Sequence, residues 1–169
     1  IPEIIKSIKT VKKRGFNLPF VYNCSGYETV AQIRALEGLV DVYLPDFKYM
    51  DKNLALKYSD AEDYPDIAKA AIEEMVRQCT EQVLDSRGIM TRGVIVRHLL
   101  LPGQVFNAKK VVRYLYENYG DTVTISLMAQ YTPMEGIGDK YPELSRRVRK
   151  SEYDRLVDFA ISLGINNAF

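Results

Sequence analysis

Two patterns of hydrophobic residues alternate along this chain: a spacing of three or four positions, which is typical of helices, and short continuous apolar segments, which are typical of strands. Near the start, apolar side chains fall three or four positions apart and predict an amphipathic helix that ends at Gly15. The same spacing predicts helices at residues 30–37, 63–86, 107–119 and 151–163. Asp63, Asn107 and Ser151 are suited to cap the last three of these helices.

Short apolar segments lie between the helices and predict strands at residues 19–24, 40–46, 93–101 and 122–129. Strands that alternate with helices pair in parallel through right-handed crossovers, so we expect one α/β domain over residues 1–169. A complete eight-stranded barrel needs about 250 residues. Four strands therefore form either a small open sheet or part of a barrel. We favour the partial barrel, because the chain begins with a helix and leaves one sheet edge without evident cover.

Polar side chains stand where the predicted strands end. In a parallel sheet these ends share one edge, so the following residues should converge: Asn23, Asp46, Lys48, Arg97, His98, Gln130 and Tyr131. Asp46 and Lys48 are two positions apart and share a face, so they form either a binding site or an ion pair at a solvated rim. Arg97 could likewise pair with a helix-end carboxylate. His98 should point away from Arg97 and serve as a hydrogen-bonded structural histidine.

Composition narrows the classes of partner. A net charge of +1 gives no overall attraction to nucleic acid, and we expect none as a partner. Neither a membrane-spanning segment nor a signal-like opening is evident, so we expect a cytoplasmic protein without a membrane partner. The two cysteines, Cys24 and Cys79, are expected as free thiols, and they are too few for a metal site. The basic residues 146–150 form either a solvated loop or a docking site for a protein or an anion.

Four segments together carry a resemblance to a known family: Asn-Cys-Ser-Gly at 23–26, Leu-Pro-Asp-Phe-Lys at 44–48, Val-Arg-His-Leu-Leu-Leu-Pro-Gly at 96–103 and Leu-Met-Ala-Gln-Tyr at 127–131. In order and spacing they resemble the later strands of pyruvate formate-lyase activating enzymes, and more closely their activase-like relatives in the radical S-adenosylmethionine superfamily. The resemblance covers most of the chain. It implies the third to sixth strands of a six-stranded, partial TIM-like barrel, which is the C-terminal part of that fold.

By this resemblance, the full-length parent would be an iron-sulfur oxidoreductase that reductively cleaves S-adenosylmethionine with a [4Fe-4S] cluster. The resulting 5′-deoxyadenosyl radical abstracts hydrogen from a glycine of a partner protein, a glycyl radical enzyme. The family's Cys-x3-Cys-x2-Cys cluster loop is absent from this chain, so we expect the chain alone to be inactive and to contain no catalytic residue or metal ligand.

The resemblance implies that this chain carries part of the S-adenosylmethionine pocket, with cofactor-binding residues Asn23, Ser25, Asp46, Lys48, Arg97, Gln130 and Tyr131. Lys48 would contact the polar end of the cofactor, and Gln130 or Tyr131 would lie near the adenosine. Asp46 and the segment 23–25 would shape the site, around a monovalent cation in the family.

Two departures from the family pattern affect these roles. The chain has Asn-Cys-Ser-Gly at 23–26 where activases have Asp-Thr-Asn-Gly, which removes an anionic ligand for the cation. It has Ala-Gln-Tyr at 129–131 where they have Pro-Tyr-His, which alters the nucleoside contact. Two other interpretations stay open. The chain could be a self-contained α/β module that binds a nucleotide or a protein without redox chemistry, or an interaction piece that self-associates through its exposed strand edge.

Overall fold

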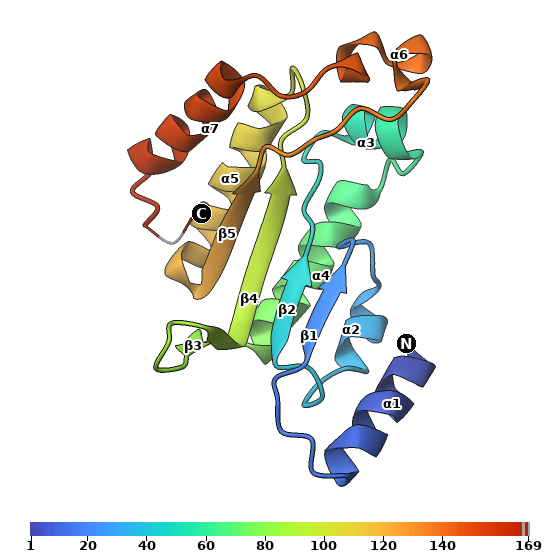
Figure 1. The fold of residues 1–169 in the computed structure, drawn as a ribbon, viewed down its shortest axis with the longest axis vertical. Helices are drawn as coiled ribbons and strands as arrows, with labels where there is room; N and C mark the ends of the chain where they lie inside the picture. Colours follow the sequence, from blue (N-terminus) through green and yellow to red (C-terminus); the bar gives the residue numbers. More distant parts are fainter. Residues whose placement is uncertain (167, 169) are drawn as a thin grey trace.

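The computed structural model describes residues 1–166 and 168, and its centre is a mostly parallel sheet (Figure 1). Parallel pairs join β1 (Val21–Cys24) to β2 (Val42–Pro45), β2 to β4 (Met90–Leu99), and β4 to β5 (Val123–Met128). A two-residue strand, β3 (Val83–Leu84), runs antiparallel to the start of β4. The α/β class with parallel strands flanked by helices is thus confirmed, and the arrangement is compatible with a partial barrel.

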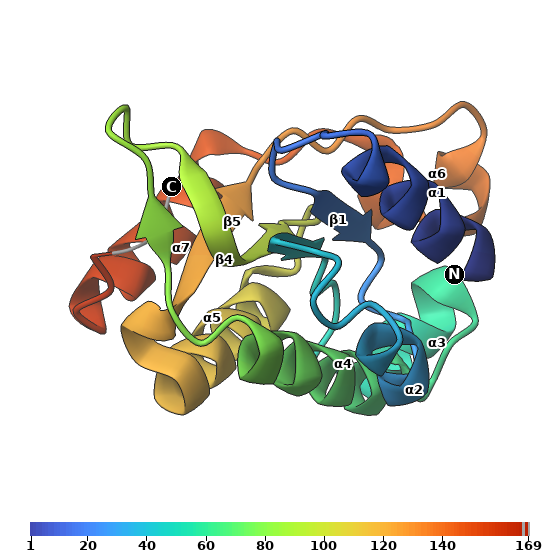
Figure 2. The same cartoon turned by 90° about the horizontal axis from the view of Figure 1, so that it is seen from below.

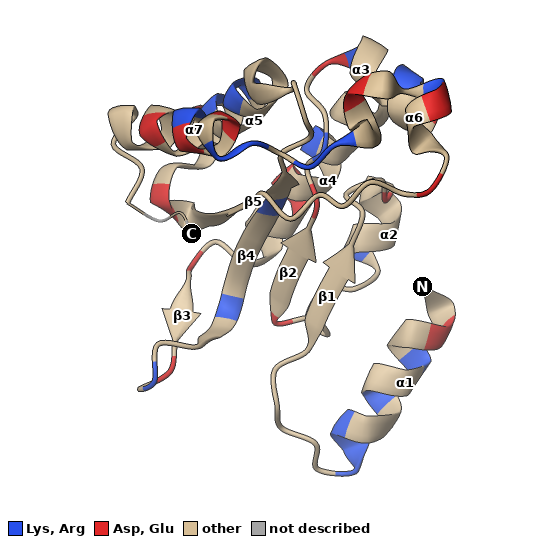
Figure 3. Ribbon diagram, turned by 45° about the horizontal axis from the view of Figure 1, so that its top comes forward, with Lys and Arg blue, Asp and Glu red and all other residues tan. Residues whose placement is uncertain are grey.

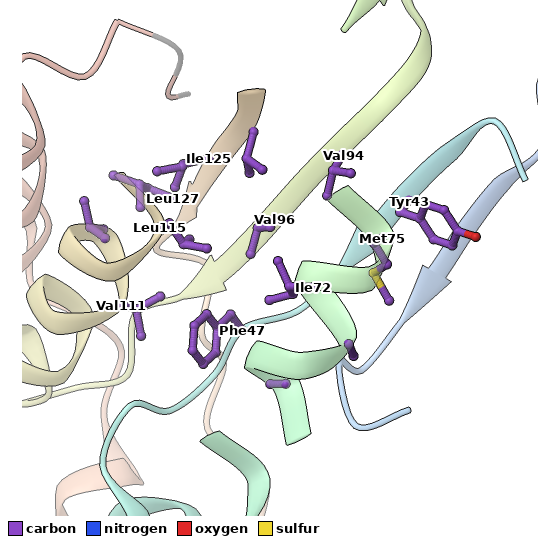
Figure 4. Packing of buried hydrophobic residues seen from close by; sticks show 14 of the residues in the cluster. Tyr43, Phe47, Ile72, Met75, Val94, Val96, Val111, Leu115, Ile125 and Leu127 are labelled. Atoms are coloured by element: carbon purple, nitrogen blue, oxygen red, sulfur yellow. The ribbon is translucent and has the colours of Figure 1, made fainter. Parts of the chain in front are cut away.

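Helices cover one face of this sheet (Figure 2). They are α2 (Val30–Arg34), α4 (Tyr64–Gln78) and α5 (Val105–Tyr119), and α7 (Lys150–Ser162) packs on α5. Side chains alternate along each strand, so every second residue enters the core between the sheet and the helices. In Figure 4, Val94, Val96 and Ile125 face Ile72 of α4 and Leu115 of α5, and none of these side chains is more than 1% exposed.

The opposite face and one edge of the sheet are less covered. Leu44, Ile95 and Met128 lie on that face and are only partly buried. The helix α1 (Pro2–Lys13) lies beyond β1, and Ile8 is the buried residue of that helix. Among the described strands, β1 pairs with β2 alone, and Val21 is 56% exposed. The open edge expected from the sequence is therefore present in this part of the chain.

The long helix predicted for residues 63–86 is too long. The helix α4 ends at Gln78, and the chain returns as β3. Cys79 and Val83 are four residues apart and imitate a helical stripe, but Val83 is 43% exposed and pairs with Arg92. The buried Cys79 lies just beyond the end of the helix, at the C-cap position.

Three short helices lie in segments for which the sequence pattern predicted neither a helix nor a strand. The helix α3 (Lys52–Ser59) begins after Asp51, whose carboxylate accepts hydrogen bonds from the backbone N–H groups of Asn53 and Leu54. The others are α6 (Ile137–Lys140) and a 3-10 helix (Pro142–Ser145), and another 3-10 turn (Gly120–Thr122) precedes β5. These helices are too short to show a clear apolar period.

The predicted caps are also wrong in detail. Asp63 stands at the N-cap of α4 but accepts a hydrogen bond from the Tyr27 hydroxyl instead of capping the helix. Asn107 lies inside α5, which begins two residues earlier. The last helix begins at Lys150, before Ser151, and its first turn is closed by Glu152.

Candidate functional site

The carboxyl ends of β1, β2 and β4 bring four predicted site residues together: Asn23, Asp46, Lys48 and Arg97. The parallel register continues past β2, because Asp46 forms a parallel bridge with Arg97 and the Phe47 N–H donates to the Arg97 carbonyl at 2.8 Å. Asn23 precedes the end of the neighbouring strand β1. The expected convergence of these four residues is therefore confirmed.

Asp46 is the centre of the charged network. Its Oδ1 accepts a hydrogen bond from Nε of Arg97 at 2.9 Å and forms an ion pair with Nη2 of the same guanidinium, 2.7 Å away. Its Oδ2 accepts from Nζ of Lys48 at 2.8 Å. Arg97 Nη2 also donates to Oδ1 of Asn23, at 2.7 Å, so one guanidinium bridges the ends of β1 and β2.

The charges of this network do not cancel. Two cations share one carboxylate, and the Lys48, Asp46 and Arg97 side chains are 36%, 22% and 25% exposed. Pairs this open to water stabilise a fold by only about 0–1 kcal/mol each, so stability alone is a weak reason for the arrangement. Both oxygens of Asp46 are already engaged, by Arg97 and by Lys48, although a carboxylate has about four acceptor sites in all. The network keeps one surplus positive charge, so it suits a ligand that brings an anionic group.

A tight turn after β1 packs against the residue that follows β2. Gly26 has φ +79°, and a Cβ added there would lie 2.2 Å from the Asp46 carbonyl oxygen, so the close approach requires glycine. The Tyr64 hydroxyl lies 2.9 Å from the carbonyl oxygens of Ser25 and Asp46 and accepts a hydrogen bond from the Lys48 N–H at 3.0 Å. Burial raises the pKa of Tyr64, so this hydroxyl stays protonated.

Asn107 supports the segment after Lys48 from the other side, and sequence reasoning missed this role. Its side chain is 5% exposed; Oδ1 accepts from the N–H groups of Met50 and Asp51, and Nδ2 donates to the Lys48 carbonyl at 3.1 Å. Asparagine is a common N-cap residue, so its residue type predicted a helix cap, although Asn107 is the third residue of the helix. Its partners lie 56 to 59 residues away, so no local pattern identifies them.

A cavity of about 250 Å³ opens beside the network. Charged groups line one part of it, and apolar and aromatic side chains line the rest; its residues are Asp46, Lys48, Tyr49, Arg97, Leu99, Leu101, Met128 and Tyr131. The Tyr131 hydroxyl donates to the Leu144 carbonyl at 2.9 Å, which holds the ring in the wall. This pocket is amphipathic, with a polar end and an apolar wall.

Three predicted site residues, Asn23, Ser25 and Gln130, do not line this cavity. Asn23 reaches the network through its hydrogen bond from Arg97. Gln130 is exposed. Ser25 is exposed too, and its hydroxyl lies 3.4 Å from a carboxylate oxygen of Glu28; only its carbonyl oxygen reaches the network, 3.4 Å from Nζ of Lys48.

Burial keeps two residues near the network in their neutral forms at neutral pH. Burial lowers the pKa of His98 to about 4, and Nδ1 lies 2.7 Å from the Phe47 carbonyl oxygen, so the ring is a neutral donor. This confirms the structural histidine on the face opposite Arg97. Burial raises the pKa of the Cys24 thiol to about 12, which removes it as a thiolate nucleophile.

Neither a metal cluster nor a membrane span is seen within residues 1–166 and 168. No three His, Cys, Asp or Glu side chains in that range gather in a way that could hold a metal ion. None of the helices described there combines the length and the apolar character that crossing a bilayer requires.

Comparison with known proteins found a distant relative of this chain in an archaeon. No family model matches the chain. The uncharacterized protein MJ0674 of Methanocaldococcus jannaschii is 29% identical over 160 residues, which cover 94% of this chain and 43% of that protein. The chain therefore spans less than half the length of this curated relative, and the name of the relative states no activity.

Proposed function

We propose that this chain supplies part of the S-adenosylmethionine pocket of a radical S-adenosylmethionine enzyme, in which it forms the third to sixth strands of a partial barrel. The observation that carries the proposal is the joined set of Asp46, Lys48 and Arg97 at the polar end of an amphipathic cavity, with Asn23 hydrogen-bonded to Arg97 behind it. Three parallel strands deliver these groups to one edge, where α/β folds bind their ligands.

The donor set of the cavity fits the chemistry of S-adenosylmethionine. Lys48 and Arg97 offer N–H donors to a carboxylate, and Asp46 offers an anion to an ammonium group, so a zwitterionic amino-acid end finds both partners. Leu99, Leu101 and the Tyr131 ring offer an apolar and aromatic wall to a nucleoside base. The role proposed for these side chains is to bind and orient the cofactor.

When bound and reduced, S-adenosylmethionine supplies a 5′-deoxyadenosyl radical, and the reductant we propose is a [4Fe-4S] cluster. Cys24 and Cys79 do not fit such a cluster, because two thiols are fewer than the three or four ligands that it needs. The described residues also contain no group of three side chains that could hold a metal ion. We therefore assign the cluster ligands to a part of the parent protein outside this chain. By its resemblance to the activases, the parent would act in the cytoplasm on a glycine of a glycyl radical enzyme.

The test uses the complete reading frame that encodes this chain, expressed and purified without oxygen. We expect a brown protein that, once reduced, cleaves S-adenosylmethionine to methionine and 5′-deoxyadenosine, which chromatography separates. A colourless protein that leaves S-adenosylmethionine intact would reject the proposal and favour a binding module without redox chemistry.

Variants locate the cofactor in this cavity. A hydrogen bond to a charged group contributes about 1.5–3 kcal/mol, so Lys48→Met or Arg97→Met should raise the KM for S-adenosylmethionine by about tenfold or more. The matched control is Lys150→Met; the Lys150 side chain is 88% exposed and, among the residues that the structure describes, forms its ion pair with Asp154. Cleavage with an unchanged KM in both site variants would place the cofactor elsewhere.

A further inference from the structure

The basic segment before α7 presents its side chains in two opposite directions. The backbone is extended at Arg146 and at Arg149, so successive side chains alternate. Arg146 donates to the buried Glu152 at 2.7 Å, and Val148 packs against the core. Arg147 and Arg149 are exposed, and neither forms an ion pair with a carboxylate of the described residues. Arg146 and Val148 therefore stabilise the fold, whereas Arg147 and Arg149 present cations to solvent.

An exposed aromatic ring lies at the start of α5, three residues after Gly103, whose N–H shares the Glu152 carboxylate with the Arg149 N–H. Phe106, in the first turn of α5, is 73% exposed, and Nζ of Lys110 lies 4.6 Å from the centre of its ring. The carboxylate of Glu152 accepts hydrogen bonds from the N–H groups of Gly103 and Arg149, both at 2.8 Å. The start of α5 and the segment before α7 are thus held side by side, and Figure 3 shows their basic positions near each other.

We propose that Phe106, Lys110, Arg147 and Arg149, here called the basic-aromatic patch, dock an acidic segment of a partner protein that also carries a large apolar side chain. The patch has three cations, and the nearby carboxylate of Glu152 is already paired with Arg146. Guanidinium groups pair with carboxylates through two parallel hydrogen bonds, and the exposed ring gives an apolar side chain a surface to cover.

Charge and position favour a protein segment over nucleic acid. The whole chain has a net charge of +1, so the positive charge is local and does not form the broad basic surface that tracks a phosphate backbone. The patch begins a few residues after Leu101, which lines the cavity described above. The inference does not depend on radical chemistry.

The test measures fluorescence anisotropy of labelled synthetic peptides with the protein from the complete reading frame, without S-adenosylmethionine. Three peptides of equal length alternate Glu with Leu, Glu with Ser, and Lys with Leu. We expect the Glu-Leu peptide to bind most tightly, the Glu-Ser peptide less tightly and the Lys-Leu peptide not at all. Binding should weaken as salt is added.

Variants assign the binding to the patch. Each exposed ion pair accounts for a factor of about five or less, so the double variant Arg147→Ala/Arg149→Ala should weaken Glu-Leu binding about tenfold. Phe106→Ala should reduce the preference for Glu-Leu over Glu-Ser. The control Lys13→Ala/Arg14→Ala removes two exposed cations at the end of α1 and should leave binding unchanged.

Three results would overturn the inference. They are no binding of the Glu-Leu peptide, equal binding by the double variant, and tighter binding of a labelled single-stranded oligonucleotide than of the Glu-Leu peptide. None of them bears on cofactor cleavage, because the assay contains no cofactor.

Discussion

The Tyr64 hydroxyl joins the two strand ends that build the charged site, so Tyr64→Phe measures how much that junction stabilises the fold. The residue is 3% exposed, and phenylalanine preserves the ring and its packing. The substitution removes the acceptor for the Lys48 N–H and the donor shared by the carbonyl oxygens of Ser25 and Asp46.

The expected change in the free energy of unfolding follows from the number of hydrogen bonds that the Tyr64 hydroxyl makes. A hydroxyl has one proton, so it donates fully to one carbonyl at a time while it accepts from Lys48. An intramolecular hydrogen bond contributes about 1 kcal/mol net, and a buried donor without a partner costs about 1–3 kcal/mol. We therefore expect Tyr64→Phe to lower the free energy of unfolding by about 2–3 kcal/mol. With a urea m-value of about 2 kcal/mol/M, the midpoint should fall by about 1 M or slightly more.

Urea titrations followed by circular dichroism give this difference, and Tyr22→Phe provides the control. Tyr22 is partly buried on β1, and no described residue forms a hydrogen bond with its hydroxyl. Its replacement should change the free energy of unfolding by less than about 0.5 kcal/mol. If Tyr64→Phe costs no more than Tyr22→Phe, the hydroxyl does not hold the strand ends together. The remaining support would then be backbone pairing, such as the Asp46 N–H donating to the Cys24 carbonyl at 3.0 Å.

Three further predictions concern the turn, the buried histidine and a buried carboxylate. Gly26→Ala should cost about 2–5 kcal/mol in a urea titration, because it combines a left-handed backbone with a Cβ 2.2 Å from a carbonyl oxygen. Burial lowers the pKa of His98 from 6.5 to about 4, so the unfolded state binds a proton that the folded state excludes. The free energy of unfolding should fall as pH decreases from 6.5 to about 4, and His98→Gln, which retains a donor for the Phe47 carbonyl, should remove that slope in thermal unfolding. The Arg146 guanidinium lowers the pKa of Glu152 from 4.5 to about 2, so the stabilisation from this carboxylate is present above pH 4.5 and is lost toward pH 2. The melting temperature of Glu152→Gln should fall less between these pH values than that of the unchanged protein, because Glu74 and Glu143, whose pKa values are also lowered, account for the rest of the loss.

The part of the site that sequence patterns predicted depends on local geometry. Asp46 and Lys48 share a face because strand side chains alternate, and Arg97 joins them because parallel strands end at one edge. Neither inference needs knowledge of distant contacts. The strands themselves were located well for the same reason, since apolar segments such as 93–101 are too short and too continuous for an amphipathic helix.

The groups that hold the site in place could not be predicted in this way. Asn107 binds backbone groups that lie nearly 60 residues earlier in the chain, and Tyr64 serves two strand ends from the start of a helix. Such contacts have no periodic signature, because each depends on how separate elements pack in space. The error at the end of α4 has the same origin, since only pairing with β4 distinguishes Val83 in a strand from one more turn of helix.

The charge balance of the network discriminates between the two kinds of ligand that the sequence left open. A nucleotide phosphate carries about two negative charges, and Asp46 would repel it from the same cations that attract it. An amino-acid end carries both a carboxylate and an ammonium group, so it can use Lys48 and Arg97 together with Asp46. One carboxylate between two cations therefore suits a zwitterionic amino-acid end, which is the part of S-adenosylmethionine that the proposed function assigns to the polar end of the cavity.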